Sequence, residues 1–231
     1  MRIDYKSFTY HKSPEPKHQF PLGMTVFTAL QGKGKSLSLV HDAFDIKKEF
    51  PECVVFSNMT LYGIRYNFYR TVSDLINALQ FKNGSKGVLI IIDEAQNYFN
   101  KKTGVPLEIM AQLCQNRKNR RCILMTSQIW EDLDVPVRKQ VHTVVKCRRF
   151  FNIQINTYHN GEQLAWDNRE NSYIAPKRFT KIFKHNDKYY SRYETLEVIE
   201  TNNELDKSLT MGQGAPPAPV KLTINTNKRK L

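Results

Sequence analysis

Residues 24–36 read Met24-Thr-Val-Phe-Thr-Ala-Leu-Gln-Gly-Lys-Gly-Lys-Ser36. The first seven residues are mostly apolar or β-branched and predict a strand. The residues after Ser36 predict a helix to Phe50, because apolar side chains recur there near the helical repeat. The turn between them has seven of the eight elements of G-x-x-x-x-G-K-[ST], with Ala29 in the place of the first glycine. A strand, a glycine-rich turn and a helix in this order predict a phosphate-binding loop.

The residue types in this loop are those that a bound triphosphate requires. Backbone N–H groups from Gly32 to Ser36, at the start of a helix, form a positive concavity for the β-phosphate. Lys35 would reach the β- and γ-phosphate oxygens, and the Ser36 hydroxyl would ligate Mg²⁺. Ala29 can replace glycine only if its φ stays negative. The alternative is a basic surface turn. The predicted nucleotide contacts are Gln31, Gly32, Lys33, Gly34, Lys35, Ser36 and Leu37.

A second motif is the run Val88-Leu-Ile-Ile-Ile92, which ends in Asp93-Glu94. Five aliphatic residues in a row are typical of a parallel strand that is buried on both faces. Asp93 would anchor Mg²⁺ beside the loop hydroxyl, and Glu94 would polarise the water that attacks the γ-phosphate. The alternative is that the two carboxylates only cap a helix that begins at Ala95. The phosphate loop earlier in the chain favours the catalytic interpretation.

A polar residue, Gln128, follows the predicted strand 121–127. There it would lie between the phosphate loop and the Asp93 strand, where it could sense the γ-phosphate or hold the attacking water. An ordinary surface glutamine is the alternative. Arg138 and Arg117 are the candidates for an arginine that reaches the ATP of a neighbouring subunit. Each could equally be a solvated charge or a contact to DNA.

The chain of 231 residues carries 35 Lys and Arg against 22 Asp and Glu, a net charge of +13. Such an excess is typical of proteins that act on polyanions. The excess is largest in residues 101–150. A basic, solvated surface is one interpretation, and a nucleic-acid track is the other. The track predicts DNA contacts by Arg117, Lys118, Arg120 and Arg121.

Several classes of protein are excluded by composition. No apolar run approaches the roughly 18–20 residues that span a bilayer, so we expect no membrane span. The first residues are polar and contain no apolar segment of the kind found in signal peptides, so we expect no secretion signal. The four cysteines show no C-x-x-C spacing, which predicts reduced, mostly buried thiols rather than a disulfide framework or a zinc site.

Strand and helix signals alternate along the chain, which predicts an α/β fold with a mostly parallel sheet flanked by helices. Beyond the segments above, we expect strands at 53–57, 141–148 and 151–158, helices at 73–80 (starting at Ser73) and 105–117, a helical turn at 135–140, and a hairpin or long loop at 59–70. The predicted domains are an N-terminal arm (1–23), a core (24–160), a β-rich extension (161–205) and a flexible basic tail (206–231).

Four segments together resemble the zonula occludens toxin-like ATPases of the FtsK/HerA branch of RecA-like P-loop motors. They read Gln-Gly-Lys-Gly-Lys-Ser, Ile-Ile-Ile-Asp-Glu-Ala-Gln-Asn-Tyr-Phe, Arg-Lys-Asn-Arg-Arg-Cys-Ile-Leu-Met-Thr-Ser-Gln, and Asp-Val-Pro-Val-Arg-Lys-Gln-Val followed by Lys-Cys-Arg-Arg. The resemblance covers about residues 22–160. It implies a P-loop NTPase fold, ATP and Mg²⁺ as cofactors, and a ring of identical subunits that moves DNA.

By motif, the resemblance makes Lys35 and Ser36 the phosphate and Mg²⁺ ligands, Asp93 and Glu94 the metal-side and catalytic acids, and Gln128 the sensor. The filamentous-phage members carry a membrane-spanning helix after the ATPase domain, and this chain has no such run. This difference favours a viral genome-packaging ATPase in the host cytoplasm or virion, with capsid or vertex proteins as partners. The alternatives are a phage-extrusion ATPase, a nucleotide-switched scaffold without turnover, and a small-molecule kinase.

Overall fold

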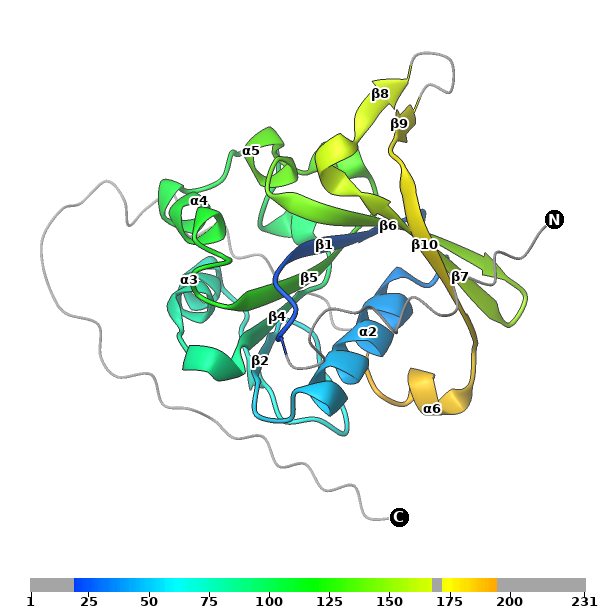
Figure 1. Ribbon diagram of the computed structural model, residues 1–231, viewed down its shortest axis with the longest axis horizontal. Helices are drawn as coiled ribbons and strands as arrows, with labels where there is room; N and C mark the ends of the chain where they lie inside the picture. Colours follow the sequence, from blue (N-terminus) through cyan, green and yellow to red (C-terminus); the bar gives the residue numbers. More distant parts are fainter. Residues whose placement is uncertain (1–18, 168–171, 195–231) are drawn as a thin grey trace, which may run out of the picture. The chain divides into compact units, whose positions relative to one another are not determined.

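One eight-stranded sheet organises the computed structural model, which describes residues 19–167 and 172–194 (Figure 1). Its strand order is β10 (Lys177–Lys184), β7 (Ile153–Asn160), β6 (Val141–Phe150), β1 (Gly23–Thr28), β5 (Arg121–Ser127), β4 (Val88–Ile92), β2 (Val54–Ser57) and β3 (Asn67–Phe68). Neighbours from β6 to β3 pair in parallel, whereas β6, β7 and β10 pair antiparallel. The carboxyl ends of the parallel strands therefore share one edge, which we call the carboxyl edge; the opposite one is the amino edge.

Helices cover both faces of the parallel strands (Figure 1). One face carries α2 (Lys35–Glu49), and the other carries α3 (Val72–Gln80), α4 (Leu107–Cys114) and α5 (Val135–Arg138). The shorter elements are η2 (Gly84–Lys86), η3 (Ala95–Asn97), η4 (Trp130–Asp132), η5 (Gly161–Gln163), α6 (Asp187–Tyr190) and the separate pair β8 (Ala165–Asp167) and β9 (Ser172–Ile174). The predicted α/β fold with a mostly parallel sheet is confirmed.

Strand β4 shows why the sheet needs helices on both sides. All five of its aliphatic side chains are fully buried. Val88, Ile90 and Ile92 pack into the apolar cluster beneath α3 and α4. Leu89 and Ile91 point the other way and pack beneath α2. Because alternate residues of a strand face opposite sides, an unbroken aliphatic run leaves neither face free for water.

Residues 59–70 form a long loop, one of the two predicted alternatives, and not a hairpin: they are mostly irregular and contain the short strand β3, which pairs in parallel with β2. The predicted start of one helix is wrong. Helix α3 begins one residue earlier than predicted, and its cap is Thr71 rather than Ser73. The Thr71 Oγ1 accepts a hydrogen bond from the backbone N–H of Asp74, and the Asp74 carboxylate accepts one from the backbone N–H of Thr71. This reciprocal capping box satisfies two helix-end donors at once.

An antiparallel extension continues the sheet beyond the parallel strands. The predicted strands 141–148 and 151–158 are confirmed as β6 and β7, joined by a two-residue connection, and β10 pairs with β7. Strand β10 belongs to the segment predicted as a β-rich extension. The predicted tail 206–231 and residues 1–18 of the arm lie outside the described residues. None of the helices in 19–167 and 172–194 is both long and apolar enough to cross a bilayer.

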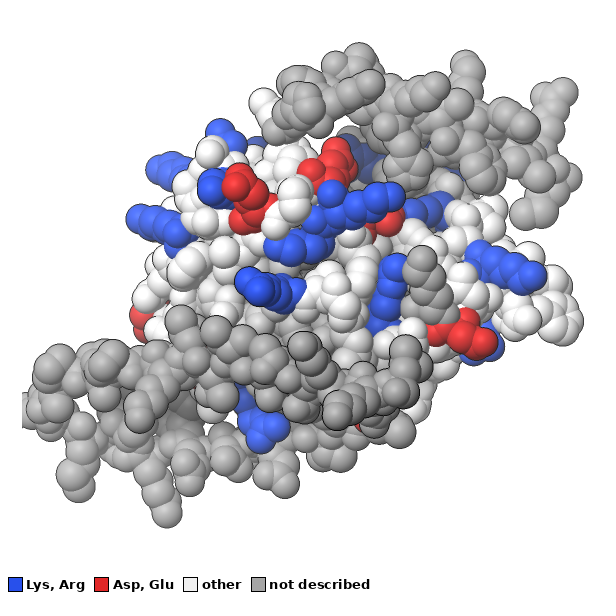
Figure 2. Space-filling view, turned by 90° about the horizontal axis from the view of Figure 1, so that it is seen from below, with Lys and Arg blue, Asp and Glu red and all other residues white. Residues whose placement is uncertain are grey.

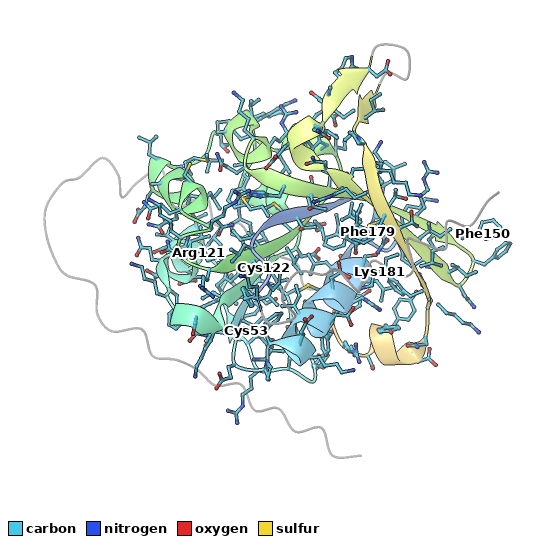
Figure 3. All side chains as sticks on the ribbon, viewed as in Figure 1. Cys53, Arg121, Cys122, Phe150, Phe179 and Lys181 are labelled. Atoms are coloured by element: carbon cyan, nitrogen blue, oxygen red, sulfur yellow. The ribbon has the colours of Figure 1, made fainter. Side chains whose placement is uncertain are left out.

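A buried ion pair joins this extension to α2 (Figure 3). The Lys181 ammonium lies 2.8 Å from the Asp42 carboxylate and 2.7 Å from that of Asp45. The Tyr158 hydroxyl also donates to Asp42, at 2.6 Å. Burial would raise the pKa of Asp42, but the hydrogen bond from His41 and the charge of Lys181 hold this pKa below its ordinary value. The charged pair is therefore a stable link between β10 and the helix that follows the glycine-rich loop.

Substitution of Lys181 by methionine should destabilise the fold, because it leaves the Asp42 carboxylate buried without its cation. We expect the free energy of unfolding to fall by about 3 kcal/mol, measured by urea denaturation at pH 7. Lys184→Met, on the same strand but exposed, is the control and should change it by less than about 0.5 kcal/mol. Equal stabilities of the two variants would contradict the proposed role of the pair.

Candidate functional site

The glycine-rich loop connects β1 to α2 at the carboxyl edge, as predicted. Gly32 and Gly34 have φ values of 74° and 81°, in the region that favours glycine. Ala29 is not among the described non-glycine residues with positive φ, so it meets the condition set for replacing glycine. Leu37 is buried in the core, so only its backbone can face a ligand. The turn leaves the first N–H groups of α2 free to bind an anion.

The loop serine and the aspartate after β4 lie side by side. The Ser36 hydroxyl donates to the Asp93 carboxylate, with Oγ 3.0 Å from Oδ1 and 3.2 Å from Oδ2. Thr126, near the end of β5, donates to the same carboxylate at 2.6 Å. The Asn58 side chain bonds the backbone of Asp93 twice: its Oδ1 accepts from the Asp93 N–H at 2.7 Å, and its Nδ2 donates to the Asp93 carbonyl oxygen at 2.9 Å. Three segments distant in sequence therefore hold Asp93 in place.

Two charged side chains of the site, Lys35 and Asp93, are half-buried. Burial raises the pKa of Asp93, although the hydrogen bonds from Thr126 and Ser36 lower it in part. Burial lowers the pKa of Lys35, and the nearby carboxylate charge of Asp93 acts in the opposite direction. The Lys35 ammonium donates to the carbonyl oxygen of Leu30 at 3.3 Å, across the loop. A hydroxyl and a half-buried carboxylate in contact are oxygen ligands of the kind that Mg²⁺ prefers, so Ser36 and Asp93 fit that ion.

Glu94 is held differently from its neighbour. Its side chain is exposed, and its φ of 52° lies in the left-handed region, which is uncommon for a residue with a side chain. The backbone N–H of Glu94 donates to Thr126 Oγ1 at 2.9 Å, and Asn97 Nδ2 donates to its carboxylate at 3.4 Å. Strain of this kind persists where the surroundings impose it, and it is concentrated at functional sites. The next residues form the 3₁₀ turn η3 rather than an α-helix.

Gln128 follows β5 directly and is exposed. Because β5 lies between β1 and β4, Gln128 stands at the carboxyl edge between the glycine-rich loop and Asp93, as the sequence predicts. Its predicted role toward a γ-phosphate stays a prediction.

The arginines lie elsewhere. Arg138 precedes β6 and Arg117 precedes β5, so both stand at the amino edge, away from the chain's own loop. Arg138 Nη1 donates to the Tyr173 hydroxyl at 3.3 Å, and Arg117 Nη2 lies 2.6 Å from His142 Nε2. Neither arginine lies at the glycine-rich loop of its own chain, and a role toward the nucleotide of another subunit stays a prediction.

One predicted DNA contact is wrong. Arg121 is fully buried, and its guanidinium donates to the backbone and side-chain oxygens of Gln112, both at 2.9 Å. Burial lowers its pKa to about 10. Lys118 and Arg120 are exposed, and their contacts to DNA stay a prediction. Figure 2 shows basic side chains spread over the face that it presents rather than gathered in one stripe.

Sequence reasoning missed the residues beneath the loop. Gln154 of β7 is fully buried, and its Nε2 donates to the Lys33 carbonyl oxygen at 3.0 Å. A Cβ on Gly34 would lie 2.1 Å from the Gln154 side chain, so only glycine fits there. The Gln154 amide also bonds Asn156 and His185, each at 3.0 Å. Polar residues at alternate positions of β7 were the available signal, but such a pattern does not distinguish a side that faces water from one that faces a buried backbone.

A cavity of about 480 Å³ opens beside the loop, between its first half and the end of β6. Lys33 lines it on the loop side. Lys146, Cys147, Arg148 and Arg149 line it on the strand side. The end of β6 therefore brings two arginines next to the glycine-rich loop.

The comparisons with known proteins agree with this geometry. Residues 24–195 match the model of the family described as zonular occludens toxin (Zot). The chain belongs to the Zot family. No curated protein sequence matches it. The crystal structure of the N-terminal domain of zonular occludens toxin from Neisseria meningitidis is similar, with 20% identity and a TM-score of 0.55; the match covers 75% of this chain and 99% of that one.

Two other solved structures are more distant. The genome packaging NTPase B204 from Sulfolobus turreted icosahedral virus 2, in complex with ATP-gammaS, has 22% identity and a TM-score of 0.46, covering 57% of this chain and 76% of that one. B204, the DNA-packaging ATPase from Sulfolobus turreted icosahedral virus, has 15% identity and a TM-score of 0.49. That match covers 73% of this chain and 100% of that one. At these scores the fold assignment rests on the Neisseria domain. The predicted Zot-like P-loop NTPase fold is confirmed.

Substitution of Gln154 by methionine tests whether this buried amide positions the loop of this Zot-family protein. Methionine keeps the volume but loses the hydrogen bond to Lys33, so the loop N–H groups should lose their fixed direction. We expect affinity for ATPγS to fall about 5- to 10-fold, measured by titration calorimetry. Gln163→Met, an exposed glutamine in η5, is the control. Unchanged affinity in a folded Gln154 variant would show that the loop needs no such support.

Proposed function

We propose that this Zot-family chain hydrolyses ATP and uses the reaction to move DNA as a ring of identical subunits. The observation that carries the ATPase part is the contact of Ser36 with the Asp93 carboxylate, beside Lys35 and the strained Glu94. The resemblance in sequence and the net charge of +13 support DNA as the polymer.

In this proposal the loop binds the triphosphate first. The N–H groups from Gly32 to Ser36 would hold the β-phosphate at the start of α2, and Lys35 would turn from Leu30 toward the β- and γ-phosphate oxygens. Ser36 and Asp93 would hold Mg²⁺, which supplies positive charge to the phosphate oxygens when bound. A bound cation also offsets the burial of Asp93, since its charge favours the ionised carboxylate.

Glu94 then acts on water. Its exposed carboxylate would accept a proton from the water that attacks the γ-phosphorus, and the bond from that phosphorus to the bridging oxygen breaks to give ADP and phosphate. Gln128 would orient the same water or contact the γ-phosphate from the neighbouring strand end. Arg138 or Arg117 would serve the ATP of an adjacent subunit, because neither lies at its own chain's loop.

Steady-state ATP hydrolysis, with and without single- and double-stranded DNA, tests the proposal. We expect DNA to stimulate hydrolysis and Lys35→Ala to abolish it. Glu94→Gln should lower kcat at least 100-fold while ATP binding is retained, because only the proton acceptor is removed. Glu49→Gln, an exposed glutamate at the end of α2, is the matched control. Tight ATP binding by the wild type with no turnover under any DNA condition would favour a nucleotide-switched scaffold instead.

A further inference from the structure

The outer face of the antiparallel extension carries unusual side chains. Residues paired across neighbouring strands share a face, and this face lies opposite α2. Near the hairpin end it presents Arg148, Phe150, Ile153, Ile155, Ile182 and Lys184, which we call the tip platform. Phe150 is 63% exposed and Ile182 is 43% exposed. Figure 3 shows Phe150 projecting from the hairpin end, away from the sheet. In β7 the polar Gln154 faces inward instead.

The turn at the hairpin end is strained but well held. Phe151 is 80% exposed and has a φ of 49°, a conformation that favours glycine or asparagine over a bulky aromatic residue. The Arg149 Nε donates to the Phe151 carbonyl oxygen at 3.0 Å, and the His185 N–H donates to that of Asn152 at 2.7 Å. Phe150 and Phe151 contact each other edge to face, with ring centres 4.7 Å apart. Two aromatic rings are thus presented to solvent at a cost in backbone strain.

The charge around the rings has one sign. Residues 141–160 and 177–186 contain no Asp or Glu. Of the basic side chains on β6 and β10, Lys181 is paired with carboxylates and Lys146 donates to the Tyr173 carbonyl oxygen. Arg148, Arg149 and Lys184 are exposed near the hairpin end, and Lys177 and Arg178 are exposed at the far end of β10. A partner at this surface should therefore be a polyanion.

We propose that the tip platform, with Phe151, binds single-stranded DNA. Exposed aromatic rings offer stacking surfaces to unpaired bases, and the flanking cations pair with phosphates. The bases of a duplex are already stacked on one another, so they are not available to stack on these rings. A second copy of this chain would bring the same sign of charge. The inference rests on the proposed function, because it takes DNA as the polymer, and it adds the strand form and the contacting residues.

The same strands connect this surface to the nucleotide site. Arg148 and Arg149 line the cavity beside the glycine-rich loop. Gln154, one residue beyond Ile153, donates to the loop at Lys33. His185 bonds both Asn152 at the turn and the Gln154 side chain. A shift of the loop backbone on ATP binding would therefore be transmitted to the tip platform through these hydrogen bonds.

Binding of a fluorescent oligothymidine to the full chain, measured by anisotropy with and without ATPγS, tests this inference. Phe151→Gly should weaken binding about 10-fold, while thermal unfolding shows an equal or more stable fold, because glycine relieves the turn. Arg148→Ala should lower the slope of log K against log salt by about 0.7, one phosphate contact on a single strand. The controls are Leu107→Ala, 89% exposed on α4, and Lys82→Ala.

The outcomes separate the inference from the proposed function. Weaker binding by Phe151→Gly and Arg148→Ala, with both controls like the wild type, would support the platform. If the wild type binds DNA and the two tip variants bind as tightly, the platform is wrong and the motor proposal stands. Tip-dependent binding to phosphatidylserine vesicles in place of DNA would also overturn it. No DNA binding by the wild type would overturn both the platform and DNA translocation. The ATPase part of the proposed function would still be tested by ATP hydrolysis in the same samples.

Discussion

The half-buried carboxylate of Asp93 joins the parts of the molecule on which its chemistry depends. It accepts hydrogen bonds from Ser36 at the start of α2 and from Thr126 on β5, and Asn58 fixes its backbone. Burial makes its charge costly, which the raised pKa records. Such a group is stable only where donors or a cation face it. The strand order that places β5 between β1 and β4 therefore defines the site as much as the motifs do.

The antiparallel extension serves this centre from the other side. Lys181 links it to α2 through Asp42 and Asp45. Gln154 supports the glycine-rich loop from below, where Gly34 leaves room for its amide. Near the hairpin end the two faces of the extension differ: the buried polar side chains of Gln154 and Asn156 face the loop, whereas the outer face carries exposed apolar and basic side chains. Farther along the same strands, the side that faces α2 is part of the apolar core.

The distribution of charge also has a structural explanation. The sequence concentrates basic residues in 101–150, but the fold separates them, as three arginines show. Arg121 lies in the core beside Gln112, Arg117 lies at the amino edge beside His142, and Arg148 lies at the hairpin end. The number of basic residues in this segment is therefore larger than the number that could line one DNA-binding surface. Only the exposed cations can contribute to polyanion binding, because a buried guanidinium has already replaced its water with protein partners.

The sequence by itself determined the parallel core and the chemistry of its carboxyl edge. A glycine-rich loop after a strand, and an aliphatic run ending in Asp93-Glu94, each require only local structure and burial on two faces. Tertiary structure alone decided the rest. Thr126, Asn58 and Gln154 meet their partners through strand order and long-range packing, which no local spacing encodes. The inward direction of Gln154 follows from its partners beneath the loop, and an alternating polar pattern can face either water or a buried backbone carbonyl.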